Sequence, residues 1–327
     1  MSIKDYLKNS RTVLFFRLLH EKFQEVVLLT KYIANGNRLN DKDKLSTDLA
    51  IRTHAIEKGM SIGSVKVGFG KPKVESLLRD LQHYLSLGGS KDFVTKSCSV
   101  INKYIAFNES LGSDMATIKD KFMIFCNNNE VNLIDKGGIY LLDKEGTEEK
   151  LKSSFDIFSQ SRFSVRDFGT DKISLNHIER ALSMAEKTPS ACNRQSWRIY
   201  VYADKAFRDK IFSLQGGCKG FWQDMQYAIL ICGDIRGYNI NELSQVYVDG
   251  GIYAMNLLYA LHFEGVASIP LTMGHKQKKI KEIKQKMDIP DNEVPILLIG
   301  VGSYKDTYKV AVSERIDYHN YTFIKNK

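Results

Sequence analysis

The sequence is poor in the residues that stabilise small secreted domains or bind structural metals. Of its 327 residues, five are cysteine, and they are widely spaced without a Cys-x-x-Cys pair. Such a pattern predicts neither a disulfide framework nor a zinc site. Proline also occurs only five times, which argues against long proline-rich linkers. The sequence therefore predicts a protein of a reducing compartment that holds no metal.

The sequence also lacks a hydrophobic run of the ~20 residues that a membrane-spanning helix requires. Its first residues, MSIKDYLKNSRTVLFF, show no signal-peptide cleavage pattern. Hydrophobic residues make up 43% and charged residues 26% of the chain, which is typical of soluble globular proteins. We therefore expect a cytoplasmic protein without a membrane span.

Positive charge exceeds negative charge, with a formal net charge of +9, but no basic arm is present. The densest run of lysines lies between Lys276 and Lys286 and has Glu282 inside it. A polyanion site is one interpretation of this run, and a solvated helix face is the favoured one. Nucleic acid is therefore not an expected partner.

The first part of the chain has the apolar spacing of helices. The predicted helices cover residues 12–34, 41–58, 74–87, 91–107 and 114–126. Asn35-Gly36-Asn37 has the composition of a turn after the first of them. That helix could lie at a membrane surface, because basic residues interleave with its apolar ones. A helix packed on two sides is the favoured interpretation.

The second part alternates between helical and strand patterns. Strands rich in valine, isoleucine and tyrosine are predicted over residues 198–202, 227–232, 266–269 and 296–301. Ser174 is placed as the N-cap of a helix, and a long helix over residues 246–264 should end at Gly265. We predict a mainly helical region over residues 1–150 and a domain of α+β or α/β layers over residues 151–327.

Three segments of this second domain carry groups suited to binding a cofactor. Arg162, Ser164 and Arg166 offer two permanently charged donors and a hydroxyl, a set that can bind a phosphate monoester. Residues 188–197 concentrate amide and hydroxyl groups in a loop between a helix and a strand. Residues 265–274 read as a strand that runs into an irregular loop containing Pro270, where backbone N–H groups would be free.

In this order the segments resemble the nitroreductase family over about residues 155–327. Arg-x-Ser-x-Arg begins at Arg162, Pro-Ser-x-x-Asn-x-Gln-x-Trp at Pro189, and Gly-x-x-Ser-x-Pro at Gly265. A Gly-x-Gly strand ending at Gly302 and a lone arginine, Arg315, follow. The resemblance implies an α+β fold of three layers, in which a central mixed sheet is flanked by helices.

The resemblance also implies an FMN cofactor and a set of residues that bind it. Arg162, Ser164 and Arg166 would bind the phosphate and ribityl chain, and Arg315 would reach the phosphate. A loop from the second subunit of a homodimer would cover the flavin, and backbone groups of the proline segment would lie near its N5 atom. The residues implied for these last two roles are Ser190, Asn193, Gln195, Pro270, Leu271 and Thr272.

The activity implied is that of an FMN-dependent oxidoreductase, in which NAD(P)H and a small-molecule acceptor react in turn at one site. The flavin carries the chemistry, so no catalytic side chain is expected. Two alternatives stay open: a non-catalytic FMN-binding dimer whose helical region binds a partner, and a flavin dehydrogenase that uses oxygen. Ser196 departs from the proline usual in the family, and so does the segment from Pro270 to Gly274.

Two further expectations concern helices. His54, Glu57 and Lys58 share a helical face, where an exposed ion pair is favoured over residues lining the flavin cleft. The helix over residues 246–264 has a broader apolar face than a surface helix needs and is expected in or near the dimer interface. The residues of that face are Val246, Ala254, Leu257, Leu258 and Leu261.

Overall fold

The computed structural model describes residues 10–32, 38–238, 242 and 244–325. These residues form two compact units. The first contains the described residues of Met1–Ile56 and Val67–Lys136, and the second contains Glu57–Lys66 and the described residues of Gly137–Lys327. Residues 137–150, assigned to the helical region from the sequence, group with the second unit. The predicted turn Asn35-Gly36-Asn37 lies outside the described residues.

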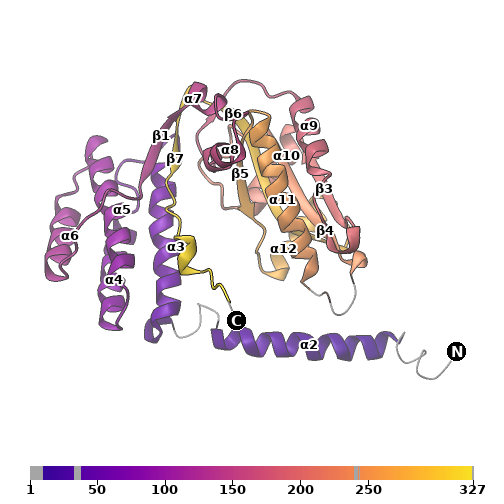
Figure 1. Ribbon diagram of the computed structural model, residues 1–327, viewed down its shortest axis with the longest axis horizontal. Helices are drawn as coiled ribbons and strands as arrows, with labels where there is room; N and C mark the ends of the chain where they lie inside the picture. Colours follow the sequence, from indigo (N-terminus) through magenta and orange to yellow (C-terminus); the bar gives the residue numbers. More distant parts are fainter. Residues whose placement is uncertain (1–9, 33–37, 239–241, 243, 326–327) are drawn as a thin grey trace. The chain divides into compact units, whose positions relative to one another are not determined.

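The first unit is helical, as the apolar spacing predicted (Figure 1). Its helices are α2 (Arg11–Tyr32), η1 (Arg38–Asn40), α3 (Lys42–Met60), α4 (Lys71–Ser86), α5 (Lys91–Ser110) and α6 (Ala116–Asn128). Ser90 caps α5 by accepting a hydrogen bond from the N–H of Phe93 at 3.3 Å. Leu81, Ile101 and Phe122 are buried where α4, α5 and α6 pack together.

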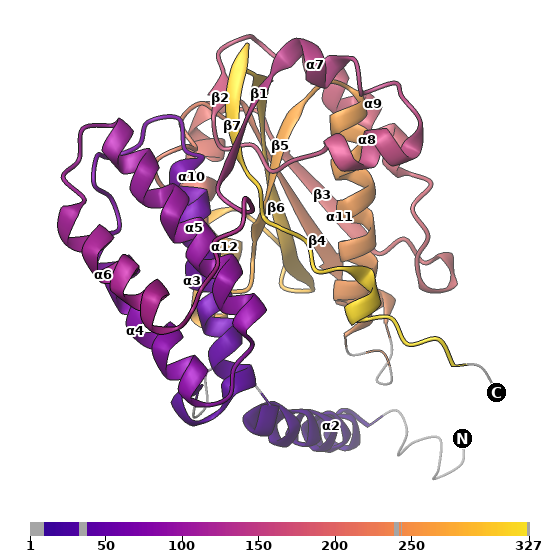
Figure 2. The ribbon, with the colours of Figure 1, turned by 60° about the vertical axis from the view of Figure 1, so that its left-hand side comes forward.

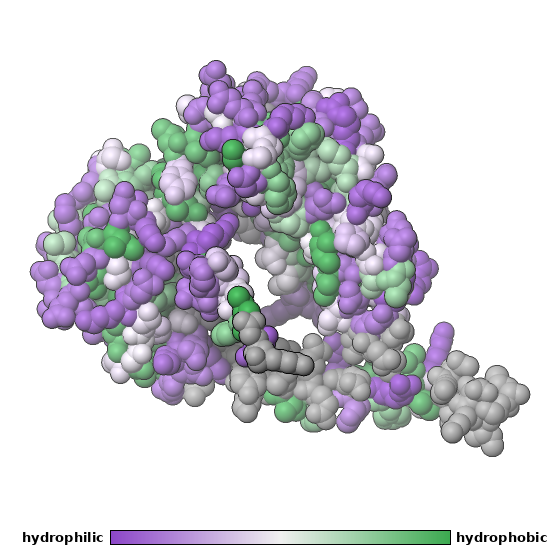
Figure 3. Space-filling model, viewed as in Figure 1, coloured by the Kyte–Doolittle hydropathy of each residue, from purple (hydrophilic) through white to green (hydrophobic). Residues whose placement is uncertain are grey.

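Helix α2 differs from the expectation of a helix packed on two sides. Phe15, Phe16 and Phe23 are 59%, 61% and 61% exposed, so this packing is not observed. Elsewhere the surface visible in Figure 3 is mostly hydrophilic, with scattered hydrophobic patches. None of the described helices is long and apolar enough to cross a membrane.

The second unit is built on a five-stranded sheet. Its strands are β2 (Phe168–Gly169), β3 (Trp197–Tyr202), β4 (Tyr227–Asp234), β5 (Ala267–Thr272) and β6 (Glu293–Tyr304). The order is β2-β6-β4-β3, and β5 also pairs with β6. All four ladders are antiparallel, whereas the resemblance implied a mixed sheet. A separate antiparallel ribbon joins β1 (Ile139–Asp143) to β7 (Thr307–Ala311).

Helices cover both faces of the sheet, which confirms an α+β fold of three layers (Figure 2). Ile229 and Ile231 of β4 pack with α9 (Leu175–Ala185) and α11 (Gln245–Phe263). Their neighbours Ala228, Leu230 and Cys232 pack with α10 (Lys205–Gln215) and α12 (Gln277–Lys286) on the other face. This alternation follows from the two-residue period of a strand. The unit's shorter elements are α7 (Lys144–Glu148), α8 (Phe155–Ser161), η2 (Ala191–Asn193), η3 (Ile235–Gly237) and η5 (Tyr318–Asn320).

Local signals placed the ends of these helices correctly. Ser174 caps α9 by accepting a hydrogen bond from the N–H of Asn176 at 3.3 Å. Gly265 follows α11 with a φ of 71°, the left-handed conformation that favours glycine at this position. The lysine run forms α12, where Glu282 pairs with Lys279 at 3.0 Å and with Lys286 at 2.7 Å, as on a solvated helix face.

The broad apolar face named for the helix over residues 246–264 lies in the core of the chain. Ala254, Leu257, Leu258 and Leu261 belong to the core cluster with α9 and the sheet. Val246 is buried beside Gly233 of β4. The opposite side of α11 also carries apolar residues. Tyr247, Val248, Ile252 and Met255 are 49%, 49%, 42% and 37% exposed. Helix α11 is thus apolar on two sides, and its place in or near a dimer interface stays a prediction.

Candidate functional site

The segment that contains Arg162 and Arg166 runs beside strand β5. Helix α8 ends at Ser161, and Arg162 continues in an extended conformation. The N–H of Val165 donates a hydrogen bond to the carbonyl of Ser268 in β5 at 3.1 Å. Two of the three segments singled out from the sequence are therefore adjacent in the fold.

The guanidinium group of Arg162 is largely buried and has no hydrogen-bond or ion-pair partner among the described residues. Its Nη1 atom is buried and makes no hydrogen bond to any described residue. Burial lowers the pKa of Arg162, and the charge of Arg315 lowers it further. Arg315 is exposed and donates from Nη1 to the carbonyl of Ser313 at 3.1 Å. Two guanidinium groups from distant parts of the chain thus lie within electrostatic reach of each other, the arrangement that an anion would stabilise.

A buried histidine supports Arg162 from the last turns of α11. His262 Nε2 lies 2.8 Å from Ser161 Oγ, and its Nδ1 lies 3.0 Å from the hydroxyl of Tyr304. Because Ser161 Oγ donates to the carbonyl of Phe158 at 2.8 Å, it accepts from His262 Nε2, and Nδ1 accepts from Tyr304. Burial and then the charge of Arg162 lower the pKa of His262 to about 4. The imidazole is therefore neutral at pH 7 and adds no charge beside Arg162.

Arg166 is a second buried cation in the same segment. It is 9% exposed and donates from Nη1 to the carbonyl of Ser164 at 3.3 Å. Burial lowers its pKa to about 10, although the nearby carboxylate of Glu57 favours the charged form. Glu57 is 4% exposed and accepts from the N–H of Gly138 at 2.9 Å. An exposed ion pair at this helix end, as favoured from the sequence, is therefore wrong for Glu57.

The loop that contains Ser190, Asn193 and Gln195 has an uncommon backbone. Cys192, Asn193 and Gln195 have φ angles of 50°, 54° and 49°, which non-glycine residues rarely adopt. Ser190 Oγ accepts from the N–H of Gln195 at 2.9 Å, and Gln195 Nε2 donates to Asn193 Oδ1 at 3.1 Å. Such strain persists where surrounding contacts hold it, and it is concentrated at binding sites.

Asp249 at the start of α11 holds this loop, a role that the sequence did not reveal. Its carboxylate accepts from the N–H of Ala191 at 3.3 Å, from the hydroxyl of Tyr238 at 2.8 Å and from Gln245 Nε2 at 2.8 Å. Asp249 is 1% exposed, so these donors replace the water that its charge would otherwise bind.

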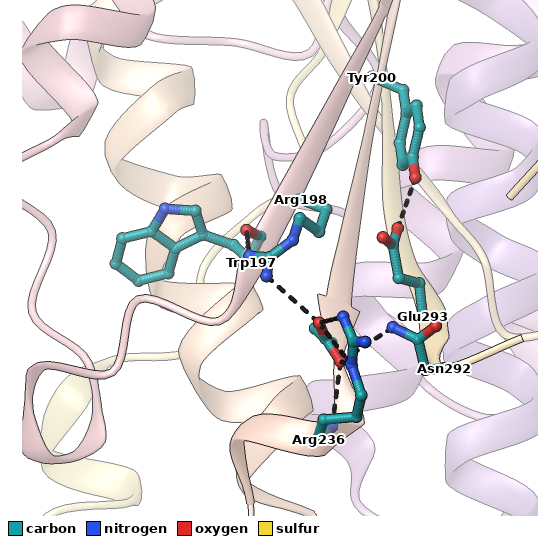
Figure 4. Close-up of polar contacts among 7 residues, drawn as sticks. Trp197, Arg198, Tyr200, Arg236, Asn292 and Glu293 are labelled. Carbon is teal, nitrogen blue, oxygen red and sulfur yellow. Dashed lines mark hydrogen bonds and ion pairs between the residues drawn. The ribbon is translucent and has the colours of Figure 1, made fainter. Parts of the chain in front are cut away.

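The end of the loop is fixed by the carboxylate of Asp234 at the end of strand β4. Figure 4 shows three of the residues around it, Arg198, Arg236 and Asn292. The N–H of Asp234 donates to the carbonyl of Ser196 at 2.8 Å. Its side chain accepts from Arg236 at 2.6 Å, from Arg198 at 3.2 Å and from Asn292 at 3.0 Å. The hydrogen bond from Arg236 is the main reason that the pKa of Asp234 lies well below its usual range. Ser196, which stands where proline is usual in the family, is thus held by its backbone.

Pro270, Leu271 and Thr272 lie in strand β5 rather than in an irregular loop, so that expectation is wrong. They pair with Ile299, Leu298 and Leu297 of β6. The carbonyl of Ser268 points away from β6 to Val165, and alternation along the strand turns the backbone of Pro270 the same way. A proline without an N–H is tolerated there. Thr272 shares this orientation, because its carbonyl accepts from Gln215 Nε2 at 3.1 Å.

The two groups of candidate residues lie near opposite ends of α11. The loop is attached at Asp249, and the arginine segment lies beside His262. At a rise of 1.5 Å per residue these positions are about 20 Å apart. The structure therefore places Arg162 and Arg166 in a segment beside β5, with Arg315 within electrostatic reach of Arg162. It keeps Ser190, Asn193 and Gln195 of the same chain away from them.

Comparisons with known proteins agree with the resemblance. Residues 160–217 match the sequence model described as the nitroreductase family. A protein of Archaeoglobus fulgidus named "Putative NADH dehydrogenase/NAD(P)H nitroreductase" is 27% identical over 148 residues, 45% of this chain and 83% of its own. An iodotyrosine deiodinase of Haliscomenobacter hydrossis is 26% identical over 188 residues, 47% of this chain and 82% of its own. These matches support the nitroreductase family for the second unit.

Solved structures match the same half of the chain. An FMN-dependent nitroreductase of Clostridium difficile is 19% identical, with a TM-score of 0.45, and covers 52% of this chain and 98% of its own. A nitroreductase of Desulfitobacterium hafniense with bound FMN is 17% identical, with a TM-score of 0.39, and covers 50% of this chain and 94% of its own.

Keeping His262 neutral should make the stability of the protein depend on pH. The ordinary pKa of histidine is 6.5, and that of His262 in the fold is about 4. Stability should therefore be complete above pH 6.5 and fall as the pH drops toward 4, because the unfolded chain then binds a proton that the folded chain does not. The loss should be on the order of 3 kcal/mol at 1.36 kcal/mol per pH unit. Chemical denaturation of wild type and His262→Gln from pH 7 to 4 measures it, and equal slopes for both proteins would contradict it.

Proposed function

We propose that the second unit binds FMN and uses NAD(P)H to reduce a small-molecule acceptor. The observation that carries this proposal is the unpartnered, buried guanidinium nitrogen of Arg162 beside the guanidinium of Arg315. Neither arginine forms an ion pair with a carboxylate in the described part of the chain. A phosphate monoester supplies the missing negative charge and several hydrogen-bond acceptors.

The same residues favour FMN over FAD. A terminal phosphate suits a pair of arginines, and no G-x-G-x-x-G sequence follows a strand, as it would at a dinucleotide site. Ser164 and Arg166 continue the segment that begins at Arg162, so they are the candidates for the rest of the cofactor. When bound, FMN supplies the electron transfer, while the protein binds and orients it.

The N–H of Thr272 is the backbone donor that fits the proposed site best. The backbone N–H of Leu271 points toward β6 and takes part in the ladder, and Pro270 has no backbone N–H. The backbone of Thr272 points away from β6, and its side chain is exposed. Of the three residues suggested by the resemblance, Thr272 alone therefore has an N–H available to a ligand.

We also propose that the site is completed by a second copy of the chain. Ser190, Asn193 and Gln195 lie about 20 Å along α11 from the arginine segment, so a partner must supply them if they are to cover the same flavin. The exposed apolar side of α11 is adjacent to Asp249, which holds that loop. A homodimer through this side would bury apolar surface and bring the loop of one copy to the arginines of the other.

Removing either arginine should weaken FMN binding but not riboflavin binding. Losing one partner of a desolvated charge pair costs on the order of 2–5 kcal/mol, so Arg162→Ala or Arg315→Ala should raise the Kd of FMN roughly 30-fold to several thousand-fold. Riboflavin lacks the phosphate, so its Kd should hardly change. Flavin titrations measure both ligands, with Arg79→Ala, an exposed arginine of the first unit, as the control. Equal losses for FMN and riboflavin would rule out the phosphate assignment.

The extracted cofactor and its turnover should identify the activity. Mass spectrometry of the purified protein should find FMN, and anaerobic addition of NADH or NADPH should bleach its absorption. With an electron acceptor added to reoxidise the flavin, NAD(P)H should then be oxidised in steady-state turnover. Recovery of FAD, or of no flavin after the protein is supplemented with flavin, would contradict the assignment of FMN as the cofactor. Bound FMN without NAD(P)H oxidation would favour the non-catalytic dimer, and oxidation of another substrate with oxygen would favour the flavin dehydrogenase.

A charge on the exposed side of α11 should separate the dimer. Light scattering should give about twice the 37.3 kDa of one chain for wild type, and Ile252→Glu should shift the mass toward that of one chain. The variant should also lose FMN affinity, because the loop of the partner is lost with the interface. Ile51→Glu places the same charge at a 65% exposed isoleucine of the first unit and should change neither property. A flavin-loaded wild-type monomer would refute the proposal.

A further inference from the structure

Residues 57–66 comprise the end of α3 and the turn after it, and they pack against the proposed flavin-binding segment of the second unit. Glu57 accepts from the N–H of Gly138, and Ile62 packs against the core cluster that contains Val165. A Cβ atom on Gly63 would lie 2.5 Å from Asp167 Oδ1, so the backbone there directly contacts the residue after Arg166. The last turn of α3 and the turn after it therefore belong beside the Arg-x-Ser-x-Arg segment.

Lys58 lies in that last turn, four residues before Ile62, and is half-buried. Burial lowers the pKa of Lys58, and the charge of Arg166 is the second cause. Arg166 is itself 9% exposed, so both cations lie close together and partly out of water. Glu57 offsets the charge of Arg166 in part, but one of its oxygens is engaged by the N–H of Gly138.

We propose that Lys58, which lies outside the part of the chain that resembles the nitroreductase family, is a cofactor-binding residue that acts together with Arg166. The proposal rests on the function proposed above. In it, Lys58 and Arg166 form a second cationic group, distinct from Arg162 and Arg315, and this group stabilises the negative charge that FMN gains on reduction.

The physical argument is that two neighbouring cations repel each other and lose hydration, and an anion between them reverses both effects. Arg162 and Arg166 are four positions apart, at most about 13 Å between their Cα atoms in an extended chain, so the two side chains can reach different parts of one cofactor. FMN extends well beyond its phosphate group, through the ribityl chain to the flavin ring. Charge near that ring tunes the electronic properties of the flavin. A cation at the Arg166 end therefore acts on the flavin rather than on the phosphate, and it favours the more negative, reduced form.

The first experiment follows the amine of Lys58 in the wild-type protein. The protein is acetylated with an N-hydroxysuccinimide ester at pH 8, with and without FMN, and the extent of modification at each lysine is measured by mass spectrometry. FMN should reduce modification of Lys58 at least several-fold. Lys66 lies in the same stretch and is exposed, so its modification should stay unchanged.

The second experiment compares Lys58→Met with Lys66→Met and Lys58→Arg by measuring the FMN dissociation constant and the midpoint potential of the bound flavin. Loss of the Lys58 charge should lower the preference for reduced over oxidised FMN on the order of ten-fold, which lowers a two-electron potential by about 30 mV. Lys58→Arg keeps the positive charge, so its midpoint potential should stay close to that of wild type. Lys66→Met should have the same FMN dissociation constant and midpoint potential as wild type. Circular dichroism of each variant identifies any loss of folding. The acetylation experiment uses the wild-type protein only, so it tests the role of Lys58 even if a variant fails to fold.

The outcomes separate this inference from the function on which it rests. If wild type does not bind FMN, the proposed function fails. If wild type binds FMN but Lys58 is not protected and Lys58→Met leaves the potential unchanged, the function stands and the role of Lys58 is refuted. A weaker Kd for Lys58→Met without a change in potential would refute the interaction with the reduced flavin.

Discussion

Burying the guanidinium of Arg162 without a carboxylate costs free energy, because the charge loses hydration that no described protein group replaces. The surroundings limit this cost instead of removing it. His262 stays neutral, and its two ring nitrogens are engaged by Ser161 and Tyr304. An anion bound beside Arg162 would offset this desolvation cost, as proposed above for the phosphate of FMN.

Helix α11 links this site to the strained loop. Its core side fills the space between the sheet and α9, which fixes the helix in place. Asp249 near one end then holds a loop with three residues at positive φ, and His262 near the other end orients the residue before Arg162. A rigid helix keeps the loop and the arginine segment at a constant separation of about 20 Å. In the proposed dimer, the geometry of the shared site would therefore depend on where α11 meets its partner.

The sequence predicted the elements better than their contacts. Helices α3 to α6 and four strands followed from periodicity, because the core selects one face of each element. Asp249 could not be found this way, since its contact with Ala191 spans 58 residues and no local pattern records it. The proximity of Arg162 and Arg315 was expected only through the family resemblance. Pro270 was read as a loop residue because proline is rare inside strands. That rule does not apply here, where the side of the backbone that would carry the N–H faces away from the ladder.

The assignment of residues 57–66 shows why a boundary drawn from composition misses part of a site. The segment between α3 and α4 reads as a glycine-rich connection, and nothing in its spacing links it to residues a hundred positions later. Ile62 nevertheless packs in the core of the second unit, and Gly63 has no side chain where Asp167 approaches. A larger residue at Gly63 would require the carboxylate of Asp167, which pairs with Lys305 at 2.6 Å, to shift. The last turn of α3 thus belongs to the second unit, and the carboxylate of Glu57 in that turn favours the charged form of Arg166.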